Sequence, residues 1–155
     1  MFTGRLHLLM EGRPPENSSY TWTTEAGTIT SALKWDIYQG DTTIYGKITN
    51  GTTFKLISAV VHYRLYRQPL SNVVMDALDG RVSTIPPGSS GIFEMSGSAV
   101  DRGCALIVDS ITLDVEDAVG KRSSGSLRVK GDAPLFWYNR GQCFWERRHY
   151  NKQAK

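Results

Sequence analysis

Apolar side chains alternate with a period of two through residues 54–66, and this pattern constrains the fold more than any other feature. A β-strand places successive side chains on opposite faces, so the alternation predicts a long, half-buried strand. A similar apolar run, residues 44–48, precedes it, and Asn50-Gly51 separates the two. Because Asn-Gly is the strongest short signal for a hairpin turn, we expect an antiparallel hairpin turned at Asn50-Gly51. The second arm would carry its side chains on two faces: Val61, Tyr63 and Leu65 on one, and His62, Arg64 and Tyr66 on the other.

Shorter segments also have the alternation or the β-branched content of strands. They are residues 5–10, 80–85, 91–95, 104–108, 111–115, 127–130 and 135–145. Residues 86–90 and 121–125 have the composition of turns or loops, because Gly permits positive φ and Pro fixes φ. This succession of short strands predicts a mainly β protein, an antiparallel sheet or sandwich.

Residues 24–38 break this pattern and favour a helix. Gly40 stands where a left-handed C-cap belongs, and Thr23 or Thr24 is available as an N-cap. A helix here would make the fold α+β. Gly and Thr at positions 27, 28 and 30 lower helix propensity, so a strand through residues 28–33 remains the alternative. The apolar residues at helical spacing are Ile29, Ala32, Leu33 and Ile37.

The chain has 155 residues, 40% of them hydrophobic, which is typical of one globular domain. We expect a single β-rich domain over residues 1–145 and a basic C-terminal tail over residues 146–155. No window of about 18 apolar residues indicates a membrane span, and charges within residues 1–13 interrupt any signal-peptide core. The expected location is therefore cytoplasmic, or the host cytoplasm and virion if the protein is viral. A single cysteine pair, Cys104 and Cys143, is no disulfide framework, so we expect free thiols in a reducing compartment.

Catalytic and metal-binding patterns are absent from the sequence. The histidines, His7, His62 and His149, have no second ligand at metal-binding spacing. A Cys/His dyad has no supporting flanking sequence, and the acidic residues within 109–117 lack the spacing and turn glycine of a calcium loop. We therefore expect a protein that is not an enzyme and that uses no cofactor, metal or small-molecule substrate.

Positive charge is concentrated in residues 121–155. This segment contains nine Lys/Arg and two acidic residues, a net charge of +7 in a chain whose formal net charge is +3. A cationic segment of this kind is typical of proteins that dock on an anionic surface, such as a membrane or nucleic acid. The remaining, net acidic part would favour head-to-tail self-association. The expected binding residues are Lys121, Arg122, Arg128, Lys130, Arg140, Arg147, Arg148 and Lys152.

Aromatic residues are interleaved with these cations. We expect Trp137, Trp145 and Tyr150 to insert at a membrane interface or to stack on bases. The alternative is that residues 135–145 form a last β-hairpin, turned at residues 139–141, with only the residues from Arg147 onward free. Such a hairpin would bury one set of side chains, Phe136, Tyr138 and Phe144, and present another, Trp137, Arg140 and Trp145.

One set of motifs lies in residues 2–40. Phe2-Thr-Gly-Arg-Leu-His-Leu is followed by Arg13-Pro14, and then by Ala32-Leu-Lys-Trp-Asp-Ile-Tyr-Gln-Gly40. A strand ending in Arg-Pro, followed by a helix that carries Trp and ends in Tyr-x-Gly, resembles the core of rhabdovirus matrix proteins. The resemblance implies a structural protein that self-associates, condenses the nucleocapsid and bridges it to anionic membrane. The basic N-terminal arm of that family has no counterpart here.

A different set of motifs lies in residues 45–93. Tyr45-Gly-Lys-Ile-Thr-Asn50 is followed by Ala59-Val-Val-His-Tyr-Arg-Leu-Tyr66, then by Ile85-Pro-Pro-Gly-Ser89 and Phe93. This order resembles the small bacterial β-sandwich modules of the FxLYD type, which implies a protein-binding module. Viral jelly-roll coat or movement proteins share the alternation, which implies a nucleic-acid-binding protein.

Together these observations favour a non-enzymatic, viral matrix-type protein. It would form homo-oligomers and bridge a nucleocapsid to an anionic membrane surface. The FxLYD-like module and the jelly-roll nucleic-acid-binding protein are the alternatives. The readings differ in the partner, which is a second copy and lipid in the first, another protein in the second and nucleic acid in the third.

Overall fold

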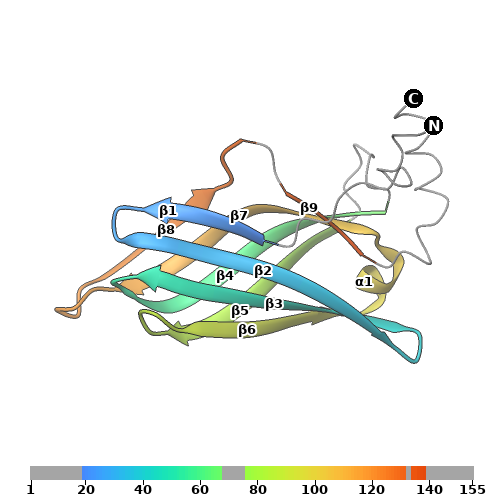
Figure 1. Ribbon diagram of the computed structural model, residues 1–155, viewed down its shortest axis with the longest axis horizontal. Helices are drawn as coiled ribbons and strands as arrows, with labels where there is room; N and C mark the ends of the chain where they lie inside the picture. Colours follow the sequence, from blue (N-terminus) through green and yellow to red (C-terminus); the bar gives the residue numbers. More distant parts are fainter. Residues whose placement is uncertain (1–18, 68–75, 132–133, 139–155) are drawn as a thin grey trace, which may run out of the picture.

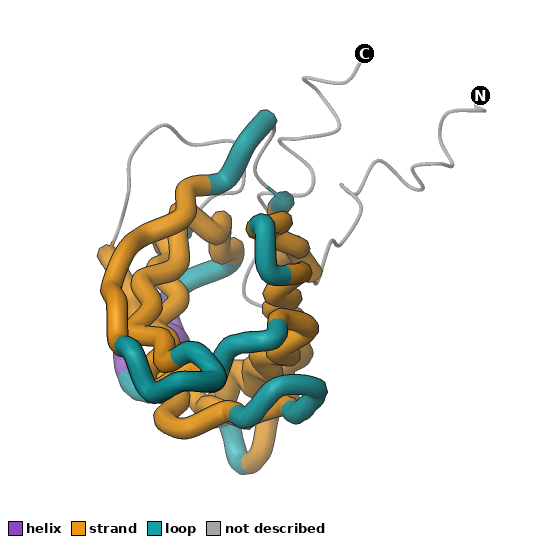
Figure 2. The backbone as a smooth tube through the Cα atoms, turned by 90° about the vertical axis from the view of Figure 1, so that its left-hand side faces the viewer, coloured by secondary structure: helices purple, strands orange, loops and turns teal. Residues whose placement is uncertain are grey.

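The computed structural model of the protein describes residues 19–67, 76–131 and 134–138, which form two antiparallel sheets (Figure 1). One sheet has the strand order β1-β2-β3-β6, and the other has the order β5-β4-β7-β8, with β9 also paired to β7. Figure 2 shows the two sheets as facing layers. The elements are β1 Ser19–Thr24, β2 Gly27–Tyr38, β3 Asp41–Thr52, β4 Lys55–Tyr66, β5 Asp76–Ile85, β6 Ser90–Ser96, α1 Ser98–Arg102, β7 Ala105–Glu116, β8 Arg122–Arg128 and β9 Leu135–Trp137. The prediction of a mainly β antiparallel sandwich is confirmed.

Most of the predicted strands that fall on described residues are present. Residues 80–85 and 91–95 lie within β5 and β6, and residues 44–48 lie within β3. The two strands predicted at 104–108 and 111–115 are one strand, β7, which is bulged at Asp109 where the register against β4 shifts. The loop predicted at 121–125 is wrong, because β8 begins at Arg122 and pairs with β7. The strand predicted at 5–10 and the part of 135–145 beyond Tyr138 lie outside the described residues.

The helix predicted at residues 24–38 is wrong, and this segment is strand β2. Its buried positions, Ile29, Ser31 and Leu33, are two residues apart and face the core. Pairing on both sides, with β1 and β3, outweighs the weak helical spacing. Gly40, expected as a helix cap, instead follows Gln39 in the β2–β3 turn, where both residues have positive φ (84° and 51°). Two successive positive φ values are the signature of a tight hairpin turn that matches strand twist.

The hairpin predicted at Asn50-Gly51 is also wrong, although both of its arms are strands. Strand β3 pairs with β2 and β6, whereas β4 pairs with β5 and β7, so the chain crosses from one sheet to the other between them. Gly51 continues the β2 pairing opposite Thr28. Neither Asn50 nor Gly51 has the positive φ that a two-residue turn requires.

Asn50 is fully buried, and its side chain holds this crossing together. Its amide nitrogen donates to the carbonyl oxygens of Phe54 (2.7 Å) and Ile85 (2.9 Å). Its amide oxygen accepts from the backbone N–H (3.0 Å) and the hydroxyl (2.6 Å) of Thr52. Its backbone pairs with the β5–β6 turn, because Asn50 N–H donates to Ser89 and Gly88 N–H donates to Asn50. One side chain therefore joins β3, the crossover segment and the end of β5.

The core lies between the two sheets and includes Phe93 of β6. Its ring lies against Gly46 of the neighbouring strand β3 and Gly80 of β5, in the facing sheet. A Cβ at either glycine would overlap the ring, so both positions must stay without a side chain. Tyr63 of β4 packs on the same ring, with centroids 6.3 Å apart. The aromatic side chain thus reaches from one sheet to the other.

We predict that Asn50→Ala lowers the free energy of unfolding by about 3 kcal/mol or more. The substitution leaves buried carbonyl and N–H groups without partners, and each such group costs about 1–3 kcal/mol. Urea unfolding followed by tryptophan fluorescence measures the loss. Thr49→Ala is the matched control, since Thr49 is on the same strand and its hydroxyl bonds to the Ser90 hydroxyl on the exposed face. It should change stability by about 0.5 kcal/mol or less. Equal effects of the two variants would contradict the assigned role of Asn50.

Candidate functional site

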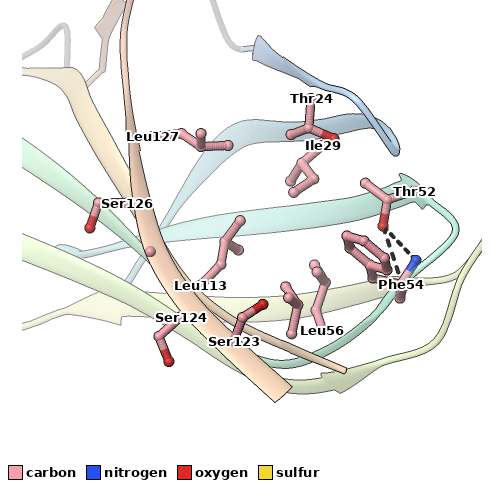
Figure 3. A pocket seen from close by; sticks show the side chains of 12 residues that line it. Thr24, Ile29, Thr52, Phe54, Leu56, Leu113, Ser123, Ser124, Ser126 and Leu127 are labelled. Atoms are coloured by element: carbon pink, nitrogen blue, oxygen red, sulfur yellow. Dashed lines mark hydrogen bonds between the residues drawn. The ribbon is translucent and has the colours of Figure 1, made fainter. Parts of the chain in front are cut away.

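A cavity of about 220 Å³ opens between β8 and the facing sheet (Figure 3). It lies at the end of the sandwich where the β1–β2 turn, the β3–β4 crossover and the start of β8 come together. Apolar side chains from both sides of the sandwich form most of its wall: Ile29, Phe54, Leu56, Leu113, Val115 and Leu127. Small or hydroxyl-bearing residues complete the lining: Thr24, Thr52, Ser123, Ser124, Gly125 and Ser126.

The cavity is open because the inner face of β8 carries little side-chain volume. Strand alternation puts Ser123, Gly125 and Leu127 on the face toward the other sheet, and of these only Leu127 is large. A Cβ built at Gly125 would have no atom within 4 Å. Protein interiors are otherwise close-packed. The sequence of β8 therefore leaves a gap where a sandwich would normally place a large apolar residue.

The backbone of β8 borders this cavity directly. The side chains of Ser124 and Ser126 point away from the apolar wall in Figure 3. On the outer face, the Ser124 hydroxyl donates to Asp114, and the Ser126 hydroxyl lies 3.2 Å from that of Thr112. Because both residues line the cavity while their hydroxyls bond elsewhere, they contribute mainly main-chain atoms to its rim.

Four of the predicted cations lie on or beside β8, and all four are exposed: Lys121, Arg122, Arg128 and Lys130. Arg122 forms an ion pair with Glu116 of β7, with its Nε 3.6 Å from the carboxylate. Within the described ranges, no carboxylate forms an ion pair with the other three. The structure thus brings these four cations together along one sheet edge, next to a cavity that the sequence did not indicate. The remaining predicted site residues, Arg140, Arg147, Arg148, Lys152, Trp145 and Tyr150, lie outside the described residues.

Trp137 was expected at an interface, and this prediction is wrong because the side chain is completely buried. It packs with Tyr66, Cys104 and Ala105 in a second, smaller cluster, separate from the core between the sheets. Its neighbours Phe136 and Tyr138 are buried in the main core, as predicted for a last strand. Both faces of β9 are therefore covered, so alternation along this strand does not bring Trp137 to solvent.

Tyr138 anchors the end of β9 to helix α1. Its hydroxyl donates to the Val100 carbonyl at 2.9 Å. Burial, reinforced by the nearby Asp101 carboxylate, raises the pKa of Tyr138 above its usual value. The hydroxyl therefore stays protonated, as its role as a donor requires.

Cys104, beside Trp137, is disulfide-bonded, so the expectation of free thiols is wrong for this residue. Cys143, the other cysteine of the sequence, lies outside the described residues. The sequence around Cys104 carries no pattern that marks it as paired, because disulfide formation depends on tertiary proximity. Cys104 is buried in the Trp137 cluster and belongs to the framework around β9.

His62 lies on the outer face of the second sheet, as the alternation predicted, but with partners that the sequence did not show. Its Nδ1 is 2.8 Å from an oxygen of Asp79, and its Nε2 is 2.8 Å from the Thr112 hydroxyl. A hydroxyl, an imidazole and a carboxylate in this order can activate a nucleophile. The side chains of His62 and Asp79, however, are about a third exposed, and neither residue lines the cavity beside β8. The chain of contacts is therefore best described as a cross-strand link between β5, β4 and β7.

The described residues contain no group of three or more His, Cys, Asp or Glu placed to hold a metal ion. The helix that the structure describes, α1, has five residues, and no helix in these ranges is long and apolar enough to cross a membrane.

Comparisons with known proteins yield distant structural similarity. No protein-family model and no curated protein matches the sequence. Similar solved structures include β-glucosidase 3B from Thermotoga neapolitana in complex with glycerol, at 14% identity and a TM-score of 0.32, covering 68% of this chain and 16% of that chain. The same enzyme in complex with α-D-glucose matches at 13% identity and a TM-score of 0.34, covering 77% and 17%. The chain thus spans about a sixth of the enzyme's length, and a likeness this low carries no functional argument.

We predict that the Cys104 disulfide contributes about 2–5 kcal/mol to stability, as disulfides in small domains do. Cys104→Ser should lower the midpoint of urea unfolding, and dithiothreitol should lower the wild-type midpoint to a similar value. The variant itself should not respond to dithiothreitol. A wild-type midpoint that is the same with and without the reductant would contradict this prediction.

Proposed function

We propose that the protein is a non-enzymatic β-sandwich module that binds a protein partner at the open cavity beside β8. The observation that carries this proposal is the combination of an apolar wall with the absence of side-chain volume at Gly125. Apolar surface exposed in a cleft is typical of sites that bind a ligand or another protein. A side chain of the partner would fill the gap at Gly125 and cover the apolar wall.

The cavity is large enough to hold one large apolar side chain of a partner, which would anchor that partner. An engineered apolar cavity of about 150 Å³ is large enough to hold benzene. The present volume of about 220 Å³ exceeds that, so a leucine or aromatic side chain fits. A few buried anchors of this kind supply most of the affinity of protein interfaces.

The fold bears on the choice between the two resemblances. The matrix-type reading depended on a helix that carries Trp35 and ends near Gly40, and this segment is strand β2 and its turn. The FxLYD-type reading depended on strands at the motifs within residues 45–93, and those motifs lie on β3, β4 and β6 and the turn before β6. The two-sheet arrangement therefore supports the module. Self-association and binding to membrane or nucleic acid stay predictions that depend on the basic residues.

The disulfide at Cys104 supports an oxidising location in place of the expected cytoplasm. Disulfides persist in secreted and periplasmic proteins and are rare where thioredoxin and glutathione keep thiols reduced. The module would then meet its partner outside the reducing cytoplasm.

The test selects ligands from a displayed library of random extended peptides, with wild type and two variants as targets. Gly125→Leu fills the cavity, and Ser83→Leu adds the same bulk to an exposed position of β5 that does not line the cavity. We expect the selected peptides to bind wild type and Ser83→Leu equally, and to lose about tenfold or more in affinity for Gly125→Leu, because the buried anchor has no room.

Stability measurements separate this result from misfolding. Filling a cavity and replacing a strand glycine both favour the folded state, so Gly125→Leu should be as stable as wild type, or more stable by about 1 kcal/mol. Selected peptides that bind Gly125→Leu as tightly as wild type would show that the cavity is not the binding site. A selection that enriches no peptide at all would count against the proposed function.

A further inference from the structure

We infer that the partner binds as an added β-strand along the free edge of β8, and that this strand alternates apolar with acidic residues. The inference rests on the proposed function, since it names the occupant of the same cavity. It combines three properties of β8: its free edge, its main chain at the cavity rim and its charge.

The free edge is the first of these. Among the described strands, β8 pairs only with β7, so it ends its sheet. An edge strand presents unpaired N–H and C=O groups that template the addition of another strand. Peptide recognition by strand addition uses these main-chain groups for affinity and side-chain pockets for specificity.

The cavity rim defines the apolar half of the partner. Ser124 and Ser126 border the cavity while their hydroxyls bond on the outer face, so the main chain of β8 is accessible from the cavity side. A strand added here would point every second side chain between the sheets. Those side chains would meet the apolar wall and the gap at Gly125. They must therefore be apolar, with the largest one opposite the gap.

The charge of β8 defines the other half. Residues 121–130 contain four cations and no acidic residue. Arg122 and Arg128 stand on the outer face, opposite Glu116 and Ser110 of β7. Arg122 already pairs with Glu116, whereas Arg128 has no ion pair in the described part of the chain. Oppositely charged residues stabilise neighbouring strands, so the outward residues of the added strand are acidic.

The facing edge strand, β1, offers no comparable preference. Its outward residues, Ser19, Thr21 and Thr23, are uncharged, and Thr21 already shares a hydrogen bond with Thr30 of β2. The charge argument therefore assigns the added strand to β8.

The experiment measures fluorescence anisotropy with a labelled peptide in which glutamate alternates with valine and leucine. Three further probes are compared: the same peptide with lysine in place of glutamate, the same peptide with alternate amides N-methylated, and a labelled DNA duplex. Vesicles of phosphatidylserine, assayed by sedimentation, provide a lipid surface. The protein targets are wild type, Gly125→Leu, an Arg122→Ser/Arg128→Ser double variant and a Lys34→Ser/Lys47→Ser double variant. The last has the same change in net charge on exposed residues of the other sheet.

We expect the glutamate peptide to bind wild type and the Lys34/Lys47 variant equally. Its affinity should fall about fivefold for the Arg122/Arg128 variant, the effect of two exposed charge pairs. N-methylation should weaken binding about tenfold or more because it removes main-chain donors. Added salt should weaken binding of the glutamate peptide, since exposed charges are screened.

Failure of the added strand and failure of the proposed function would give different results. A lysine peptide that binds as well, or an N-methylated peptide that binds as well, overturns the acidic strand while leaving the proposed cavity site intact. Equal losses of affinity for the glutamate peptide in the two double variants would show that only the net charge of the protein matters. That result would also overturn the acidic strand. Tight binding of DNA or vesicles that depends on Arg122 and Arg128, without peptide binding, assigns the edge to another class of partner. A glutamate peptide that binds Gly125→Leu unchanged overturns the proposed function itself.

Discussion

The buried carboxamide of Asn50 is the interaction on which the rest of the sandwich depends. Its hydrogen bonds hold the chain where it leaves the first sheet for the second between β3 and β4. By accepting from Thr52 and donating to Phe54 and Ile85, it satisfies main-chain groups that neither sheet can pair there. Burial without these bonds would cost several kcal/mol. The crossover therefore stays closed, and Phe54 is held at the wall of the cavity.

The same crossover determines where the sandwich is open. The β5–β6 turn pairs with the backbone of Asn50 and closes one side between the sheets. On the other side, β1 and β8 end their sheets without pairing to each other. Small residues at positions 123 and 125 leave that side unfilled, and the cations of β8 border it. The gap in the cavity wall, the free main-chain edge and two of the four cations thus come from the seven residues of β8.

Much of the fold was predictable because strand alternation is a local property. Residues 54–66 and 91–95 alternate strongly, and both are strands. Alternation does not say which strands pair, so it predicts a turn at Asn50-Gly51, where β3 continues before the chain crosses to the other sheet. In residues 24–38 the apolar residues also happen to fall at helical spacing, which predicts a helix where the structure has strand β2. The charge count places four cations close together in the chain, and they lie on or beside β8, whereas alternation fails for Trp137 because β9 is covered on both faces.

The sequence alone determined a β-rich chain with polarised charge, since strand periodicity and charge counts are read residue by residue. Tertiary structure decided the rest. The cavity exists because Gly125 faces Ile29 and Phe54 across two sheets, and the edge exists because no described strand pairs beyond β8. The His62 contacts likewise join residues that are distant in the chain. Such features depend on which segments are brought together, and that is a property of the folded chain as a whole.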